Sequence, residues 1–289
     1  MTSNAKETPL LLTDELRLKT KGLHSKMDRL VQLGLFAVLD YKVYRQILLG
    51  FYYVFKTFEE EYQLQLEKSP VNMSLLSAHS PELRRTEAFE ADLAYFYGPQ
   101  WKEQVKPTEH VQAYMDHIRD IAKNKPEKLI AFPATLYLGI FFGGQIVRSK
   151  IVKAINFFPS PPEKKMGGES DNCIAIFTFR ERDPSTGHAS GKRLDPNNAK
   201  NMLKARLNNI PGINDQTADS IAAREAIAEE AKEIFVRNLD LITSAEGVWS
   251  VWVRWIFTFV LYAAVAFGIY QYVVLQFNGG NSANKEHEL

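Results

Sequence analysis

The stretch YLGIFFGG, residues 137–144, combines the composition of a buried helix with three glycines in its last six positions. Each glycine costs about 1 kcal/mol relative to alanine inside a helix, so a helix weakened three times needs a compensating reason. One interpretation is close packing against a neighbouring helix, which small residues permit. The other is a flat ligand that lies directly on the backbone, where any side chain would obstruct it. The stretch alone leaves both open.

The segments on either side of this stretch carry helical patterns, and together they predict an all-α domain. Thr13 is expected to cap the first helix, and Ser80 with Pro81 is expected to open the third. The chain shows no internal repeat and no alternation of strands with helices. Apolar residues recur at helical spacing in segments 12–33, 42–68, 80–98, 108–124, 127–158, 198–209 and 217–242.

The helical pattern stops between residues 159 and 198, where the chain is rich in Pro, Gly, Ser and charged residues. The β-prone run CIAIFTF, residues 173–179, is the exception within it. We expect a mobile loop that contains one extended segment, because a long stretch without periodic apolar residues has no face to bury.

Composition narrows the class of protein. The chain has 289 residues, 45% of them hydrophobic, which suffices for one full-sized domain with appendages. A net charge of +1 without a basic run gives no support to a nucleic-acid partner. A single cysteine, Cys173, excludes an internal disulfide and a multi-thiolate zinc or iron–sulfur site. Phosphate-binding loops, dinucleotide-binding glycine motifs and nucleophile elbows are absent from the sequence.

The C-terminal region predicts a membrane anchor. Residues 255–277 carry no charge, and a bilayer core needs about 20 such residues. Trp249 and Trp252 precede them as part of an interfacial belt. The expected organisation is a disordered N-terminus (1–10), a domain (11–245) with a mobile loop (159–198), a juxtamembrane linker (246–254), a transmembrane anchor (255–277) and a lumenal tail (278–289).

Topology follows from the two ends of the chain. The N-terminus has an apolar run of only three leucines, too short for a secretory signal. We therefore expect the domain to face the cytosol and the tail to be lumenal. The final EHEL loosely resembles lumenal retrieval tetrapeptides. Together these features predict a tail-anchored protein of the endoplasmic reticulum membrane, in contact with membrane lipid.

Histidines offer one candidate metal ligand. His110 and His117 are seven residues apart with nothing nearby to complete a metal site, which favours a surface pair. His24 follows Arg17 and Lys21 by seven and three residues, spacings that place all three on one helix face. A solvated polar face explains that pattern. The alternative is a neutral imidazole that ligates a metal beside two cations that bind the ligand's acids.

Lys200 and Lys204 form a second cationic pair at i, i+4, far along the chain. Four cations, one histidine and a glycine-weakened apolar helix are the parts that a haem pocket needs. The imidazole ligates iron, the glycines let the backbone approach the macrocycle, and the cations meet the two propionates. Each part by itself is unspecific.

From about residue 13 to residue 242 the sequence resembles a membrane-tailed haem oxygenase, and it is most similar to the fungal branch of that family. The segments that carry the resemblance are LRLKTKGLHSKMDRL, FYYVFKTFEEEYQ, SPELRRTEAFEADLAYFYGPQW, YLGIFFGGQ, FFPSPPEKKMGGESDNCIAIFTF and EEAKEIFVRNLDLI. The resemblance implies haem b sandwiched between a proximal helix and a kinked distal helix.

The resemblance also implies roles for single residues. His24 would be the proximal ligand to the iron, and Asp28, one turn later, would hydrogen-bond the other imidazole nitrogen and fix its tautomer. Phe235 and Asn238 would face the pocket. The propionate-binding cations would be Arg17, Lys21, Lys200 and Lys204, and the glycines of the distal helix that lie on haem would be Gly139, Gly143 and Gly144.

The distal stretch departs from the family's usual pattern. Most members have an aspartate at the position of Ile140, where it holds a water network that delivers a proton to dioxygen. The network's usual tyrosine and arginine are replaced by Ala134 and Leu136, and Phe55 stands where a tyrosine often does. Tyr114 and Asn238 are retained, and they would carry the missing function through a rearranged water chain.

The resemblance implies an enzyme that cleaves haem to biliverdin, carbon monoxide and ferrous iron. Dioxygen and electrons would be consumed, the electrons coming from NADPH through a flavoprotein of the cytochrome P-450 reductase type. Haem would be both cofactor and substrate. The alternative is a non-enzymatic haem-binding sensor or carrier with the same fold, which the loss of the distal aspartate at Ile140 favours. Which carbon of the ring is attacked does not follow from the sequence.

Overall fold

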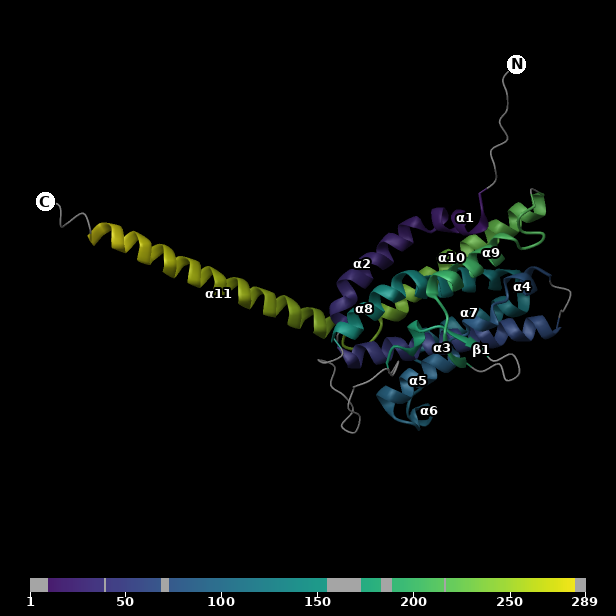
Figure 1. Ribbon diagram of the computed structural model, residues 1–289, viewed down its shortest axis with the longest axis horizontal. Coiled ribbons are helices and arrows are strands. Elements are labelled where there is room, and N and C mark those ends of the chain that lie inside the picture. The colour runs from purple at the N-terminus through teal and green to yellow at the C-terminus, as the bar shows by residue number, and fades with distance from the viewer. Residues whose placement is uncertain are drawn as a thin grey trace, which may run out of the picture. The chain divides into compact units, whose positions relative to one another are not determined.

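The structure is a computed structural model that describes residues 10–38, 40–68, 73–154, 173–182, 189–215 and 217–283. The chain divides into two compact units, Met1–Glu246 and Gly247–Leu289. The first unit is a helical domain, drawn with its elements labelled in Figure 1. Its α-helices are α1 (Leu12–Lys19), α2 (Lys21–Val38), α3 (Tyr41–Lys68), α4 (Met73–Ala78), α5 (Thr86–Tyr97), α6 (Trp101–Gln104), α7 (Glu109–Asn124), α8 (Gln145–Ala154), α9 (Pro196–Asn208) and α10 (Ala218–Thr243).

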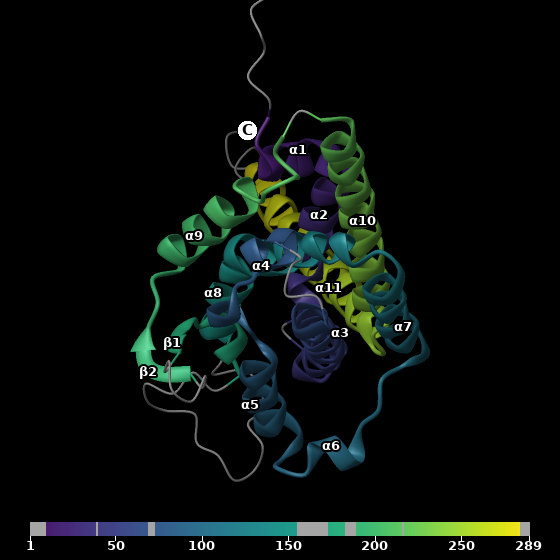
Figure 2. The same cartoon turned by 90° about the vertical axis from the view of Figure 1, so that its right-hand side faces the viewer.

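The core of the domain is built around α3. This helix packs against α5 and α7, and α10 contacts α1, α2 and α7. In Figure 2, α3 lies in the middle with α8 and α9 on one side and α7 and α10 on the other. Phe58 of α3 stacks on Phe132 with ring centroids 5.4 Å apart, and both rings are buried. Burial of such side chains contributes about 1.5–3 kcal/mol each relative to exposure.

The glycine-bearing stretch lies in an irregular helical segment, residues 126–154, that we call the distal segment. It runs through the 3₁₀-helix η2 (Pro126–Ile130), the π-helical turns η3 (Pro133–Tyr137) and η4 (Ile140–Gly144), and then α8. Wide turns of this kind cluster at functional sites and bend a helix. By length and hydropathy Pro126–Val152 could cross a membrane, but half of it is buried inside the domain, which identifies it as a core helix.

The run CIAIFTF is not the extended segment that its β-prone composition predicts. Ala175–Phe177 form the 3₁₀-helix η5, because the buried carboxylate of Asp92 accepts hydrogen bonds from the backbone N–H groups of Ala175 (2.9 Å) and Ile176 (3.0 Å). The strands follow instead: β1 (Arg180–Arg182) pairs antiparallel with β2 (Ala189–Arg193). Residues 159–172 and 183–188 of the predicted loop lie outside the described residues.

Two predicted helix starts are wrong in detail. Thr13 is not a cap but a buried residue inside the first turn of α1, and its backbone N–H donates to Asn208 Oδ1 at 3.0 Å. Ser80 precedes only the 3₁₀-helix η1 (Pro81–Leu83), and its hydroxyl donates to the carbonyl of Ala78. The helix predicted to start there, α5, begins at Thr86. Thr13 makes its tertiary bond through the backbone N–H and Ser80 bonds within the local turn, so neither side chain caps a helix.

The second unit is the single helix α11, Val248–Ala283. Its segment Val248–Leu275 is long and apolar enough to be a candidate membrane span, and its most apolar part is unburied, although Val251 near its start is buried. The helix takes in most of the expected juxtamembrane linker, 246–254, and the start of the expected tail. The linker, anchor and tail boundaries therefore stay predictions, and residues 284–289 lie outside the described part of the chain.

Candidate functional site

His24 projects from α2 toward α10. Its ring meets the buried ring of Phe235 edge-on, with centroids 4.5 Å apart and an interplanar angle of 62°. The rest of the His24 side chain is exposed. The aromatic contact fixes one side of the imidazole and leaves a ring nitrogen accessible to a ligand, so the structure brings together two residues that the sequence separates by more than 200 positions.

The His24 imidazole is held neutral near pH 7. Partial burial lowers its pKa below the usual 6.5, the Arg17 guanidinium lowers it further, and the Asp28 carboxylate opposes both by raising it. Asp28 thus acts on the ring through its charge, and its side chain is exposed. A neutral imidazole is the form that ligates a metal.

This balance of charges predicts opposite effects of two substitutions. In the haem-free protein, Asp28→Asn removes the group that raises the His24 pKa, so the pKa should fall further below 6.5. Arg17→Gln removes a group that lowers it, so the pKa should rise. Titration of the His24 ring signals by NMR measures both shifts. Equal pKa values in the two variants would show that neither charge acts on His24.

Lys21 lies in the same helix as His24, but Arg17 does not. A break at Thr20 places Arg17 in α1 and Lys21 in α2. The Thr20 hydroxyl donates to the carbonyl of Leu16 at 2.6 Å, a bond that bends helices. Since the His24 N–H still donates to the Thr20 carbonyl at 2.9 Å, Arg17 remains close enough to affect the His24 pKa.

The three glycines of the distal segment have two different environments. A Cβ atom on Gly139 or Gly143 would meet nothing within 4 Å, whereas one on Gly144 would lie 3.0 Å from Phe177 Cδ1 and 3.3 Å from Ile140 Cγ2. Gly144 is therefore needed for close packing, the first interpretation of the stretch. Gly139 and Gly143 border open space, which is what the second interpretation requires of a ligand-facing backbone.

Alanine substitutions separate these two uses of glycine. Gly144→Ala forces the buried Phe177 ring to shift and should lower the free energy of unfolding by about 1–3 kcal/mol, as overpacking does. Gly139→Ala and Gly143→Ala should leave that free energy unchanged or raise it by up to ~1 kcal/mol, while weakening haem binding. Chemical denaturation and haem titration of the three variants check this. Equal stability losses at all three positions would contradict the division.

Lys200 and Lys204 of α9 converge on the distal segment. Their Nζ atoms lie 5.2 and 5.6 Å from the centroid of the Phe142 ring in η4. Lys200 also donates to Asn197 Oδ1 at 3.1 Å. The two lysines therefore lie at the glycine-bearing turn, as a propionate-binding pair would, and their contact with Phe142 was not predicted from the sequence.

Tyr114 and Asn238, the two retained polar residues, contact each other. The Tyr114 hydroxyl donates to Asn238 Oδ1 at 3.2 Å, and both side chains are buried. Burial raises the Tyr114 pKa well above 10, which keeps the hydroxyl protonated and able to donate. Asn238 lies one turn from Phe235 on α10, so this polar pair is on the helix that also contacts the His24 ring.

The replaced residues make the distal side apolar. Leu136 is buried, while Ala134 and Ile140 are half-buried. The buried Phe55 ring lies 5.9 Å from that of Tyr137 and 5.0 Å from that of Phe89. These side chains can shape and dry the pocket, but none of the four can hold a water molecule or relay a proton.

The buried carboxylate of Glu59 lies behind the distal segment and was not predicted from the sequence. Glu59 is only 4% exposed. Its carboxylate accepts from the Tyr137 hydroxyl (3.0 Å), the Arg85 N–H (2.6 Å) and the Thr86 hydroxyl (2.6 Å). Burial lowers the Arg85 pKa to about 10, so the guanidinium stays charged at neutral pH. Glu59 is one of three consecutive glutamates in the sequence, and only its helical phase distinguishes it.

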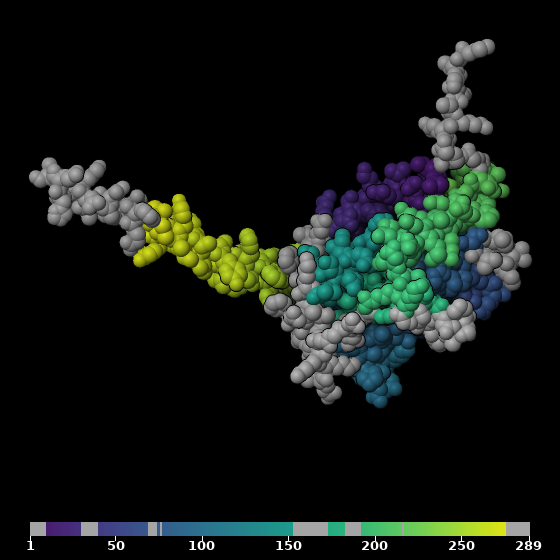
Figure 3. All heavy atoms as spheres, in the orientation of Figure 1, coloured from purple at the N-terminus to yellow at the C-terminus, as the bar shows by residue number. Residues whose placement is uncertain are grey.

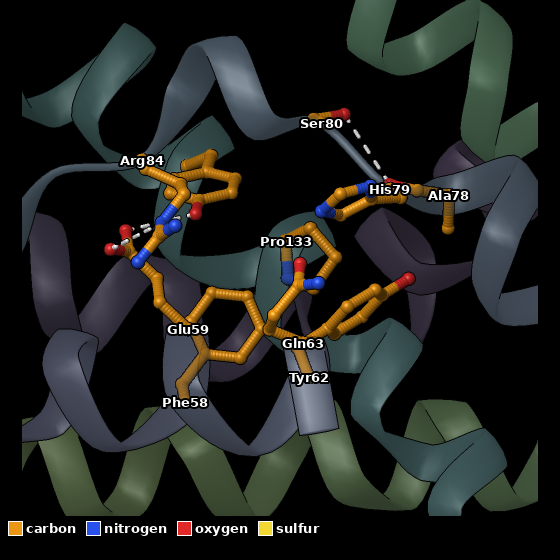
Figure 4. Close-up of a pocket in the computed structure, with 10 residues that line it drawn as sticks. Phe58, Glu59, Tyr62, Gln63, Ala78, His79, Ser80, Arg84 and Pro133 are labelled. Carbon is orange, nitrogen blue, oxygen red and sulfur yellow. Dashed lines mark hydrogen bonds and ion pairs between the residues drawn. The ribbon is translucent and has the colours of Figure 1, made fainter. Parts of the chain in front are cut away.

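A small pocket adjoins Glu59, lined by residues of α3, α4, η3 and the segment around η1. Figure 4 shows Arg84 reaching toward Glu59, and His79 beside Tyr62. The Arg84 Nε lies 3.6 Å from Glu59 Oε2, and the His79 ring stacks on Tyr62 with centroids 5.8 Å apart. The pocket is lined by both Tyr137 and Glu59, the residue that accepts the hydrogen bond of the Tyr137 hydroxyl.

His117 is not part of a surface pair. Its Nε2 lies 2.8 Å from Oε1 of the buried Glu230, which also pairs with Lys128 at 3.4 Å. His110 is exposed. His117 thus ties α7 to α10, and its seven-residue separation from His110 has no functional meaning in this structure.

Comparison with known proteins identifies the family and the fold. The sequence profile of the heme oxygenase family matches residues 10–244. Heme oxygenase 1 of Synechocystis sp. is 30% identical over 238 residues, which cover 82% of this chain and 85% of the relative. Human heme oxygenase 1 is 29% identical over 239 residues, covering 81% of this chain and 71% of the relative.

Solved structures that resemble this chain are also heme oxygenases. The crystal structure of heme oxygenase-1 from Synechocystis in complex with heme has a TM-score of 0.66 and 27% identity, and the match covers 88% of this chain and 100% of that one. That of heme oxygenase-2 from the same organism, in complex with heme and NO, also has a TM-score of 0.66, with 26% identity over 83% and 86% of the two chains. The branch within the family stays a prediction. The chain belongs to the haem oxygenase family.

Proposed function

We propose that this protein cleaves haem oxidatively to biliverdin, carbon monoxide and ferrous iron. The reaction would use dioxygen and electrons that come from NADPH through a flavoprotein reductase. Family membership and the haem complexes of the relatives support haem as substrate and cofactor. The observation that carries the proposal for this chain is the constellation of His24, the open backbone at Gly139 and Gly143, and the convergent Lys200 and Lys204.

These residues fit haem. His24 offers an accessible, neutral nitrogen donor supported by Phe235. Gly139 and Gly143 leave room for a flat macrocycle against the distal backbone. Two lysines with no carboxylate partner among the described residues supply positive charge for propionates. A donor, a flat cradle and anion-binding cations are the set that haem binding requires.

The chain's own residues would bind, orient and protect the substrate. Haem, when bound, supplies the iron at which dioxygen is reduced, and its ring is what is opened. His24 would hold the iron, and the lysines would fix the rotation of the macrocycle. Ile140 and Leu136 would exclude water from the distal side. The Tyr114 hydroxyl, hydrogen-bonded to Asn238, is the retained group with a proton to hold near the pocket.

A turnover assay tests the proposal against the alternative of a haem carrier. The full-length protein in detergent is loaded with haem and supplied with NADPH, a reductase of the cytochrome P-450 reductase type and air. Loss of the Soret band with appearance of biliverdin supports the enzyme. A Soret band that persists through many equivalents of NADPH supports the carrier, in which Ile140 would have abolished ring opening.

The apolar helix α11 supports a membrane anchor, and we propose a tail-anchored protein of the endoplasmic reticulum with its domain facing the cytosol. Its span is long enough for a bilayer, and the most apolar part of it is unburied. Confinement of enzyme and reductase to one membrane would raise their effective concentration. A freely diffusing enzyme would not have this higher effective concentration, which gives the anchor a function.

Removal of α11 should release a folded domain. A chain that ends after Glu246 keeps the hydrogen bonds between the Gln46 side chain and the Glu246 backbone, 3.1 and 3.2 Å long, that fasten the end of the domain. We expect this fragment to be soluble and to bind haem like the full-length protein, which itself should pellet with membranes and resist alkaline extraction. A fragment that fails to bind haem would show that the domain extends beyond Glu246.

A further inference from the structure

Phe142 is an exposed aromatic residue in the middle of the glycine-bearing turn η4. Its side chain is 52% exposed, although the residues on either side of it are a buried phenylalanine and a glycine. The elements α9 and η4 contact each other, and Figure 3 shows the surfaces of α9 and the distal segment adjoining on one face of the domain. Both lysines of α9 that face this surface lie over the Phe142 ring, at 5.2 and 5.6 Å from its centroid.

Among the described residues, no acidic side chain neutralises the charges of these two lysines. Lys200 donates to the neutral Asn197, and neither Lys200 nor Lys204 forms an ion pair within the part of the chain that the structure describes. Other lysines do pair with a carboxylate: Lys19, Lys56, Lys102, Lys128, Lys192 and Lys232. Two adjacent ammonium groups without a counter-ion repel each other, and the negative face of an aromatic ring partly offsets that repulsion.

We propose that Phe142 is a positioning residue for the substrate. Its ring gathers the ammonium groups of Lys200 and Lys204 at the edge of the haem site, so that both meet the carboxylates of the macrocycle in a fixed arrangement. This inference rests on the proposed function. In this proposal Phe142 controls the rotational orientation of haem in the pocket. Through that orientation it also controls which position of the ring is opened.

The physical reason is preorganisation. A lysine side chain has four rotatable bonds and loses conformational entropy when it is immobilised. Lysines that the ring already holds lose less on binding, which strengthens binding and favours one orientation over its alternatives. The opposing interpretation is that Phe142 only covers apolar surface. Ile146, 54% exposed and one turn later in the same distal segment, provides the matched control for that role.

The experiment compares Phe142→Leu, Phe142→Tyr and Ile146→Ala in the full-length protein in detergent. Lysine amines are dimethylated with ¹³C, and the signals of Lys200 and Lys204 are assigned with Lys→Gln variants. We expect ring-current shifts of both signals that Phe142→Leu abolishes and Phe142→Tyr retains. Phe142→Leu should weaken haem binding roughly three- to tenfold, because the two lysines are then immobilised only when haem binds, and it should broaden the mixture of biliverdin isomers. Phe142→Tyr and Ile146→Ala should match the wild type.

A double-mutant cycle tests whether Phe142 acts through the lysines. In a Lys200→Gln, Lys204→Gln background, Phe142→Leu should have no further effect on haem affinity. An additive effect, unshifted lysine signals, or an unchanged affinity and isomer mixture in Phe142→Leu would overturn the proposal. A wild-type protein that binds haem without forming biliverdin would contradict the proposed function, and the affinity and NMR comparisons would still decide the role of Phe142.

Discussion

Replacement of His24 by alanine is expected to reduce biliverdin formation at least about 100-fold while part of the haem binding remains. The substitution removes the nitrogen that would ligate the iron, and axial ligation is one of the protein's principal means of controlling haem chemistry. The open distal backbone and the two lysines stay in place, so a weaker complex should still form. Initial rates of biliverdin formation and haem titrations measure the two effects separately.

Imidazole in solution and a second histidine provide the controls. Free imidazole can occupy the space left beside Phe235, so it should restore part of the rate in His24→Ala. His110→Ala, which removes an exposed histidine of α7, should leave both rate and affinity unchanged. A His24→Ala variant that turns over like the wild type would remove His24 from the mechanism.

Replacement of Ile140 by aspartate is expected to raise the yield of biliverdin per haem several-fold. Positioned proton transfer contributes about 10²–10⁴-fold to rates, and Ile140 can neither hold water nor relay a proton. The Cγ2 of Ile140 lies beside Gly144, where a shorter aspartate side chain fits without a clash. We also expect lower peroxidase-like activity when hydrogen peroxide replaces dioxygen, because the proton would be delivered productively.

Ile140→Asn separates the effect of the acidic proton of aspartate from the effect of its side-chain size. Asparagine has the size of aspartate and can hold water, but it has no acidic proton to exchange. It should therefore give a smaller gain than aspartate. An Ile140→Asp variant that keeps its fold and haem occupancy but gains no yield would show that this chain delivers protons by another route. The Tyr114–Asn238 pair would be the first place to look for it.

The helical fold could be predicted from the sequence because apolar residues at helical spacing form one face of each helix, and that face must be buried. The large helices α3, α7 and α10 appear where that pattern places them. Local signals were less reliable. Thr13 and Ser80 have the chemistry of caps, yet each is used in a tertiary hydrogen bond or a turn. CIAIFTF has a β-prone composition, but the buried Asp92 carboxylate from a distant helix turns it into η5.

The candidate site could be predicted only in part, because the contacts between distant segments do not follow from local sequence. The resemblance indicates which residues matter, and the structure then places His24 against Phe235, Tyr114 against Asn238, and both lysines at η4. The resemblance does not indicate that Gly144 packs against Phe177 while the backbone at Gly139 borders open space. Nor does it point to Glu59, because a buried glutamate in a run of three cannot be told from its exposed neighbours without knowing which face of α3 is inside.

The most direct test of the central claim is the amount of carbon monoxide released per haem in a single turnover of the full-length protein with NADPH, reductase and air. Carbon monoxide is formed only when the ring is opened, so it distinguishes enzymatic cleavage from non-specific bleaching of the Soret band. We expect carbon monoxide and biliverdin in amounts equal to the haem consumed. Loss of haem without carbon monoxide, or a Soret band that survives with none released, would contradict the claim.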